Sequence, residues 1–149
     1  MKKIIFITTI LALGYSCNKI NCSLPAQTNG TGEIISNAEI VQTNILDVDF
    51  NREYVINSDS ANTIDAKVEF NNGTTDSINF TNYTLLGKWA EGGCNVVIER
   101  DVERKNSEKR LIYTLEVHEC GNCDMLTGSM NWVLVPKIPE DYTVEFIVK

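Results

Sequence analysis

Hydrophobic and polar positions divide the chain into an apolar leader, a polar segment and a long region of alternating residues. From Glu33 onwards, apolar, aromatic and β-branched residues recur with a period near two, which predicts β-strands. No long helical pattern and no internal repeat is visible. The expected strands are Ala38–Thr43 with a start near Glu33–Ile35, Glu53–Asn57, Tyr83–Trp89, Cys94–Val102, Leu111–Cys120, Asn131–Lys137 and Thr143–Val148.

One short helix is predicted after the second strand. Ser58 or Asp59 is suited to cap its start, and Ile64 and Val68 are spaced four residues apart, as on one face of a helix. The helix would run to Ala66 or Val68. A strong turn signal, the Asn-Gly pair at 72–73, closes the element.

The second half predicts one long hairpin with a charged turn at Glu103–Arg110. If Val102 lies opposite Leu111, one face of the hairpin is apolar and the other polar, as a half-buried antiparallel pair requires. The Gly-Gly pair at 92–93 is expected to stop the preceding strand. The cross-strand pairs predicted by this register are Arg100 with Tyr113, Ile98 with Leu115, and Val96 with Val117.

These elements predict an α+β fold that is mainly β. We expect an antiparallel sheet or small β-sandwich of about six to eight strands with one short helix. The hydrophobic share of 43% is enough for a globular core. Residues 33–149 are expected to form a single domain.

The first 17 residues predict export. Lys2 and Lys3 precede Ile4–Leu13, an uncharged apolar run that is too short to span a bilayer but fits a signal peptide. Small residues before Cys17 favour cleavage after residue 16 and acylation of Cys17, as in bacterial lipoproteins. The alternative is an ordinary signal peptide and a secreted or periplasmic protein. Residues 17–32 are polar and contain proline and glycine, which indicates a flexible tether.

Charge excludes one class of partner. The formal net charge is −7, and it becomes −9 when Lys2 and Lys3 leave with the signal peptide. An acidic chain does not suit nucleic acid, because phosphate binding depends on Lys and Arg. Membrane attachment is therefore expected through the N-terminal lipid alone.

Four cysteines remain if Cys17 is acylated, and an even number in an oxidising compartment favours disulfides. Cys94 is expected to pair with Cys120 or Cys123, because the two strands of the hairpin place these residues near one another at its open end. Whichever of Cys120 and Cys123 is left over would pair with Cys22 or stay a free thiol. The connectivity stays open.

Two chemical alternatives use the same cysteines. Cys94, His118, Cys120 and Cys123 contain three thiols and the single histidine of the chain, a plausible structural zinc set. The CxxC at 120–123 also resembles a dithiol redox motif, but no βαβ pattern or supporting helix surrounds it. No catalytic residue and no cofactor is predicted otherwise.

The segments that follow residue 78 resemble a known family in their order. These segments are Asn79-Phe80, Leu85-Leu86-Gly87, the run from Gly92-Gly93-Cys94 to Arg100, a strand ending at Cys120, Trp132 to Pro136-Lys137, and Val144 to Val148. They are similar to the C-terminal domain of the PrcB family, the lipoprotein subunit of bacterial protease complexes. Tyr54-Val55-Ile56 with Ser58 and Asp59 resembles the opening of that domain.

The resemblance implies a small β-rich domain in a cell-surface lipoprotein with no catalytic residues. We therefore expect a non-enzymatic accessory or binding protein of the cell envelope, most simply at the outer membrane of a Gram-negative bacterium. Its partner would be an exported protease or another envelope protein. The alternatives are a thiol- or zinc-dependent envelope protein using Cys94, Cys120 and Cys123, and a ligand-binding or adhesin-like module using Trp89 or Trp132.

Overall fold

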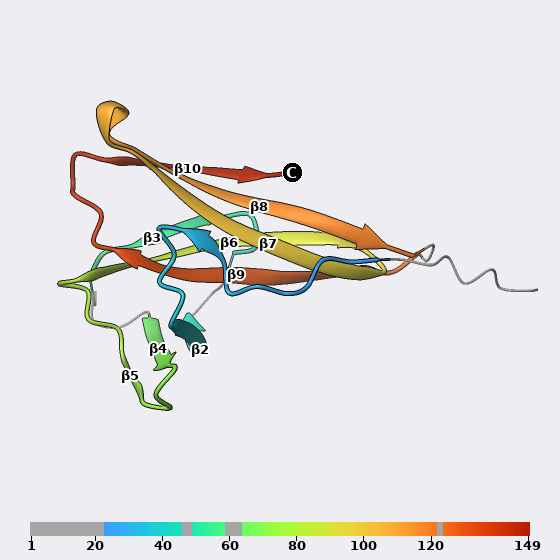
Figure 1. Ribbon diagram of the computed structural model, residues 1–149, viewed down its shortest axis with the longest axis horizontal. Coiled ribbons are helices and arrows are strands. Elements are labelled where there is room, and N and C mark those ends of the chain that lie inside the picture. The colour runs from blue at the N-terminus through green and yellow to red at the C-terminus, as the bar shows by residue number, and fades with distance from the viewer. Residues whose placement is uncertain (1–22, 46–48, 59–63, 122–123) are drawn as a thin grey trace, which may run out of the picture.

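A computed structural model describes residues 23–45, 49–58, 64–121 and 124–149, and these residues form three layers of β-sheet (Figure 1). The prediction of a mainly β fold is confirmed. One outer sheet has the strand order β1-β7-β8-β10, the middle sheet β3-β6-β9, and the other outer sheet β2-β4-β5. The elements are β1 (Thr31–Gly32), β2 (Ala38–Ile45), β3 (Glu53–Ile56), β4 (Ile64–Phe70), β5 (Thr75–Ser77), β6 (Tyr83–Gly93), β7 (Asn95–Lys105), a 3-10 turn (Asn106–Glu108), β8 (Arg110–Cys120), β9 (Leu126–Pro136) and β10 (Thr143–Val148).

The middle sheet is covered on both faces. Successive side chains of a strand point to opposite faces, so Leu85 and Leu86 of β6 enter different cores. Leu86 packs with the β7–β8 hairpin, and Leu85 packs with β4. Val133 and Leu134 of β9 divide in the same way. Burial on both sides explains why these two strands read as continuous apolar runs and not as alternating ones.

The β7–β8 hairpin is present, but its predicted register is wrong by two residues. Arg100 lies opposite Leu115 and Ile98 opposite Val117, not opposite Tyr113 and Leu115. The turn is tighter than predicted, because the strands continue to Lys105 and resume at Arg110. A slip of two residues leaves each side chain on its predicted face.

Strand β10 adds to the hairpin in parallel with β8, where an antiparallel sheet was expected. Thr143 pairs with Arg110 and Val148 with Leu115. The short β1 also pairs with β7 in parallel. Each addition places an edge strand beside the hairpin in the outer sheet. Figure 1 shows β10 next to β8.

The helix predicted after the second strand is wrong over residues 64–68. Those residues form strand β4, which pairs with β2 and β5. Ala66 and Val68 are both buried against the middle sheet. A spacing of four fits one helix face and also one strand face, so Ile64 and Val68 did not distinguish the two. Residues 59–63, which include the predicted cap Asp59, lie outside the described residues. The turn at 72–73 is confirmed, with Gly73 at φ +78°.

At two positions in strand β6, glycine leaves space that a neighbouring side chain occupies. Strand β6 ends at the predicted Gly-Gly pair, but it includes both glycines and so extends beyond Trp89 to Gly93. A Cβ at Gly92 would lie 2.7 Å from a carboxylate oxygen of Glu119, so glycine lets the outer sheet approach. Gly87 is paired with Trp132, and a Cβ there would lie 2.1 Å from the indole ring.

Candidate functional site

Cys94 and Cys120 meet where the chain passes between the middle and outer sheets. Cys94 is the single residue between β6 and β7, and its φ of +59° turns the chain from one layer into the other. A β-bridge joins it to Cys120, which ends β8 and is buried. Gly121 lies beneath, where a Cβ would come within 3.1 Å of the Cys94 sulfur. Strict alternation along the hairpin would put Cys94 and Cys120 on opposite faces, and the left-handed conformation of Cys94 interrupts that alternation.

The other predicted cysteines, Cys17, Cys22 and Cys123, lie outside the described residues. Their lipidation, pairing or metal binding therefore stays a prediction. Within the part of the chain that the structure describes, the one group of potential ligand atoms lying within 4.8 Å of one another comes from Glu99, Glu116 and His118. This group contains none of the cysteines in the proposed zinc set.

His118 lies on the outer face of the β7–β8 hairpin, on strand β8. Its Nε2 lies 2.9 Å from an Oε2 atom of Glu99. Glu99 lies directly opposite Glu116 on β8, and His118 is two residues further along that strand. The sequence pattern put Glu99 on the solvated face but gave no reason to join it to His118, because the predicted register placed it opposite Thr114.

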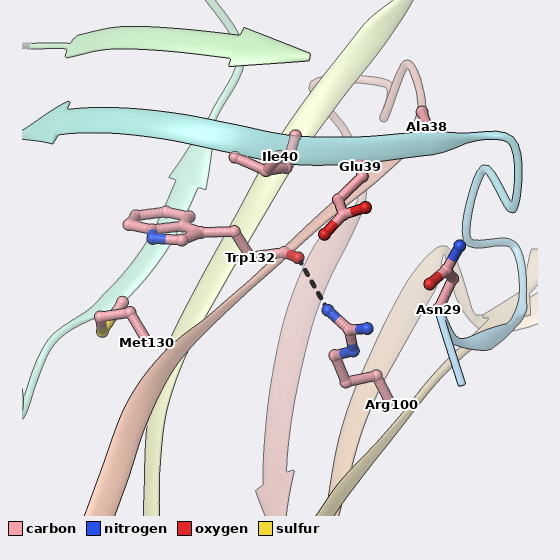
Figure 2. Close-up of a pocket in the computed structure, with 7 residues that line it drawn as sticks. All are labelled: Asn29, Ala38, Glu39, Ile40, Arg100, Met130 and Trp132. Atoms are coloured by element: carbon pink, nitrogen blue, oxygen red, sulfur yellow. Dashed lines mark hydrogen bonds between the residues drawn. The ribbon is translucent and has the colours of Figure 1, made fainter. Parts of the chain in front are cut away.

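A small cavity lies between β2, β7 and β9 (Figure 2). Its volume is about 120 Å³, which is smaller than the roughly 300 Å³ at which pockets for drug-sized ligands begin. Figure 2 shows the Arg100 guanidinium and the Glu39 carboxylate turned into the same space. Arg100 donates to the carbonyl oxygens of Thr28 (2.9 Å) and Trp132 (3.5 Å). The cavity suits a single small polar group. It is lined by Asn29, Ala38, Glu39, Ile40, Arg100, Met130 and Trp132.

The two tryptophans predicted as an alternative ligand site pack against different neighbours. Trp132 packs against Tyr54, with ring centroids 5.3 Å apart, and covers Gly87. Trp89 contacts Phe50, with centroids 4.5 Å apart, and its Nε1 donates to Glu91 (3.1 Å). Both rings are therefore engaged by neighbouring residues of the fold.

The outer edge of β10 offers unpaired backbone groups. Thr143 N–H donates to Lys109 (3.0 Å), and Lys149 N–H donates to Leu115 (2.9 Å). In a parallel pair, alternate residues of a strand bond to its neighbour. Val144, Phe146 and Val148 therefore direct their N–H and C=O groups away from β8. Within the described residues, β10 is the last strand of its sheet, and nothing pairs with this edge.

Among the described residues, no helix is long and apolar enough to cross a membrane. Compared with known proteins, the chain matches no family model, no curated protein and no solved structure.

Proposed function

We propose that this chain is an exported lipoprotein of the bacterial cell envelope that has no enzymatic activity and holds a partner protein through the free edge of β10. The leader at residues 1–16 and the small residues before Cys17 support export and acylation. The resemblance to the PrcB family supports an accessory role and an exported protease, or another envelope protein, as the partner.

The free edge of β10 is the observation that carries the binding role. Proteins commonly protect edge strands with proline, lysine, bulges or a covering segment. The six residues of β10, TVEFIV, contain neither proline nor lysine. An edge of six residues is about 20 Å long and accepts an added strand from another chain.

The edge also indicates the chemistry of its occupant. Glu145 is the one charged residue within β10, and its carboxylate is already paired with Arg110 at 2.7 Å. A neutral edge rich in Val, Phe and Ile best fits an extended, largely uncharged segment with apolar side chains on alternate positions. We therefore assign the occupant as such a segment of an exported protein.

A disulfide between Cys94 and Cys120 belongs to the same proposal. The β-bridge between the two residues and the burial of Cys120 support it, and neither cysteine is without a partner. Such a bond would fix the open end of the β7–β8 hairpin, the hairpin to which β10 is attached. An exported protein meets the oxidising conditions that the bond needs.

Val148→Pro tests the edge directly. The N–H of Val148 faces away from β8, so proline removes an edge donor without breaking the ladder, and the side chain is 45% exposed. Val148→Ala is the matched control, because it trims the side chain and keeps the N–H. We expect both the wild type and Val148→Ala to recover the same cross-linked partner from solubilised envelopes, identified by mass spectrometry. Val148→Pro should recover at least about tenfold less.

Equal recovery by Val148→Pro would overturn the edge assignment, as would recovery of nothing but a second copy of this chain. The anchor is tested separately with Cys17→Ser. This change should move the protein from the membrane fraction to the soluble fraction. Unchanged membrane association would contradict acylation of Cys17.

A further inference from the structure

The outer face of the β7–β8 hairpin gathers one imidazole and two carboxylates. Glu99 and Glu116 form a cross-strand pair, and His118 follows on the same face of β8. One ligand atom from each of the three residues lies within 4.8 Å of the other two. The three side chains are intermediate or exposed, so an ion from solvent reaches them.

Two like charges directly opposite each other destabilise a pair of strands. Glu99 and Glu116 stand in this relation on β7 and β8. Within the described residues, neither carboxylate forms an ion pair with a lysine or an arginine. The contact that the structure gives these carboxylates is the one between Glu99 and His118, at 2.9 Å. A bound cation would relieve the repulsion that the register creates.

A cavity of about 210 Å³ opens beside the two carboxylates. It is lined by Thr28, Thr31, Glu99, Arg100, Asp101, Thr114 and Glu116. Within this lining, the Thr31 hydroxyl donates to the Asp101 carboxylate at 2.5 Å. The space leaves room beside the two carboxylates for water or another small ligand.

We propose that Glu99, Glu116 and His118 bind a divalent transition-metal ion, with Zn²⁺ as the ion that fits the ligand set best. An imidazole nitrogen with two carboxylate oxygens suits zinc, whereas calcium and magnesium prefer oxygen ligands alone. Three protein ligands leave a fourth position for water or another small ligand. The site is independent of the partner-binding edge and differs from the proposed cysteine set by its two carboxylates.

Calorimetric titration of the full chain with zinc chloride tests this site. The protein is purified in detergent and freed of metal with a chelator. We expect saturable one-to-one binding with a Kd in the micromolar range, and no comparable binding of magnesium. Glu116→Gln and His118→Gln should each weaken zinc binding at least about tenfold. Glu103→Gln, on the same strand face as Glu99 but outside the group, should leave zinc binding unchanged.

Glu116→Gln also separates this site from a cysteine site, since it removes a carboxylate and touches no thiol. Its thermal unfolding in the absence of metal should match or exceed that of the wild type, because the repulsion with Glu99 is removed. Absence of saturable zinc binding would overturn the proposal. Zinc binding that is undiminished by Glu116→Gln, or weakened equally by Glu103→Gln, would also overturn it.

Discussion

Removal of the proposed Cys94–Cys120 bond provides a quantitative test of the structure. The perturbation is Cys94→Ser, Cys120→Ser, the double variant, or reduction of the wild-type chain. A β-bridge, which is a backbone contact, joins the two residues, so the substitutions leave that contact available. The two serines are close in size to the cysteines they replace, so the cost measured is mainly that of the lost cross-link.

The magnitude follows from the loop that the bond closes. Residues 94–120 form a loop of about 27 residues, and the chain-entropy relation gives about 3.5 kcal/mol at 25 °C for a loop of this length. A domain of this size has a stability of roughly 5–15 kcal/mol. The reduced protein should therefore still fold, with a much smaller free energy of unfolding.

Urea unfolding followed by tryptophan fluorescence measures the difference. The oxidised wild type should unfold at a urea concentration on the order of 2 M higher than the reduced wild type. Cys94→Ser, Cys120→Ser and the double variant should all match the reduced wild type. Equality of the single and double variants is required, because either substitution removes the whole cross-link.

Cys123→Ser distinguishes the two pairings that the sequence left open. If Cys94 pairs with Cys120, this variant keeps the full stability of the oxidised protein. A loss as large as that of Cys94→Ser would show that Cys123 is the partner. If oxidised and reduced wild type unfold at the same urea concentration, the protein has no stabilising disulfide at Cys94. Thiol or zinc chemistry at these cysteines is then the better explanation.

Two further predictions concern buried hydroxyl groups. Thr84 is fully buried, donates to Asn57 (2.5 Å) and accepts from the N–H of Ile138 (3.0 Å). Thr84→Val should therefore lower the free energy of unfolding by about 2 kcal/mol, measured in urea, and clearly more than Thr84→Ser, which keeps the hydroxyl. Burial raises the pKa of the Tyr113 hydroxyl, so the stability it provides should be complete below about pH 10, the unfolded pKa, and decrease as the pH rises further. Tyr113→Phe should flatten the decrease in the free energy of unfolding between about pH 9 and 11, measured in the same urea assay. At neutral pH it should lose the hydrogen bond to the Asn131 carbonyl oxygen (3.0 Å). A pH slope equal to that of the wild type would contradict the assignment.

Much of the second half was predictable because its signals are local. The strand at residues 143–148 was predicted with the bounds that the structure shows. The hairpin around the charged turn was also predicted, since β-branched and aromatic residues on both sides of a polar stretch leave little choice. The helix prediction over residues 64–68 was wrong because its local signal was ambiguous: a spacing of four between Ile64 and Val68 fits both a helix and a strand.

For the β7–β8 hairpin, the sequence by itself determined which residues face the core and which face water, because that follows from alternation along its two strands. It could not determine the register, since a slip of two residues preserves both faces of a hairpin. That slip places Glu99 opposite Glu116 in place of Thr114, and so creates the proposed metal site. The three layers, the parallel addition of β10 and its place at the end of the sheet that the structure describes depend on contacts between distant segments, and only the tertiary structure decided them.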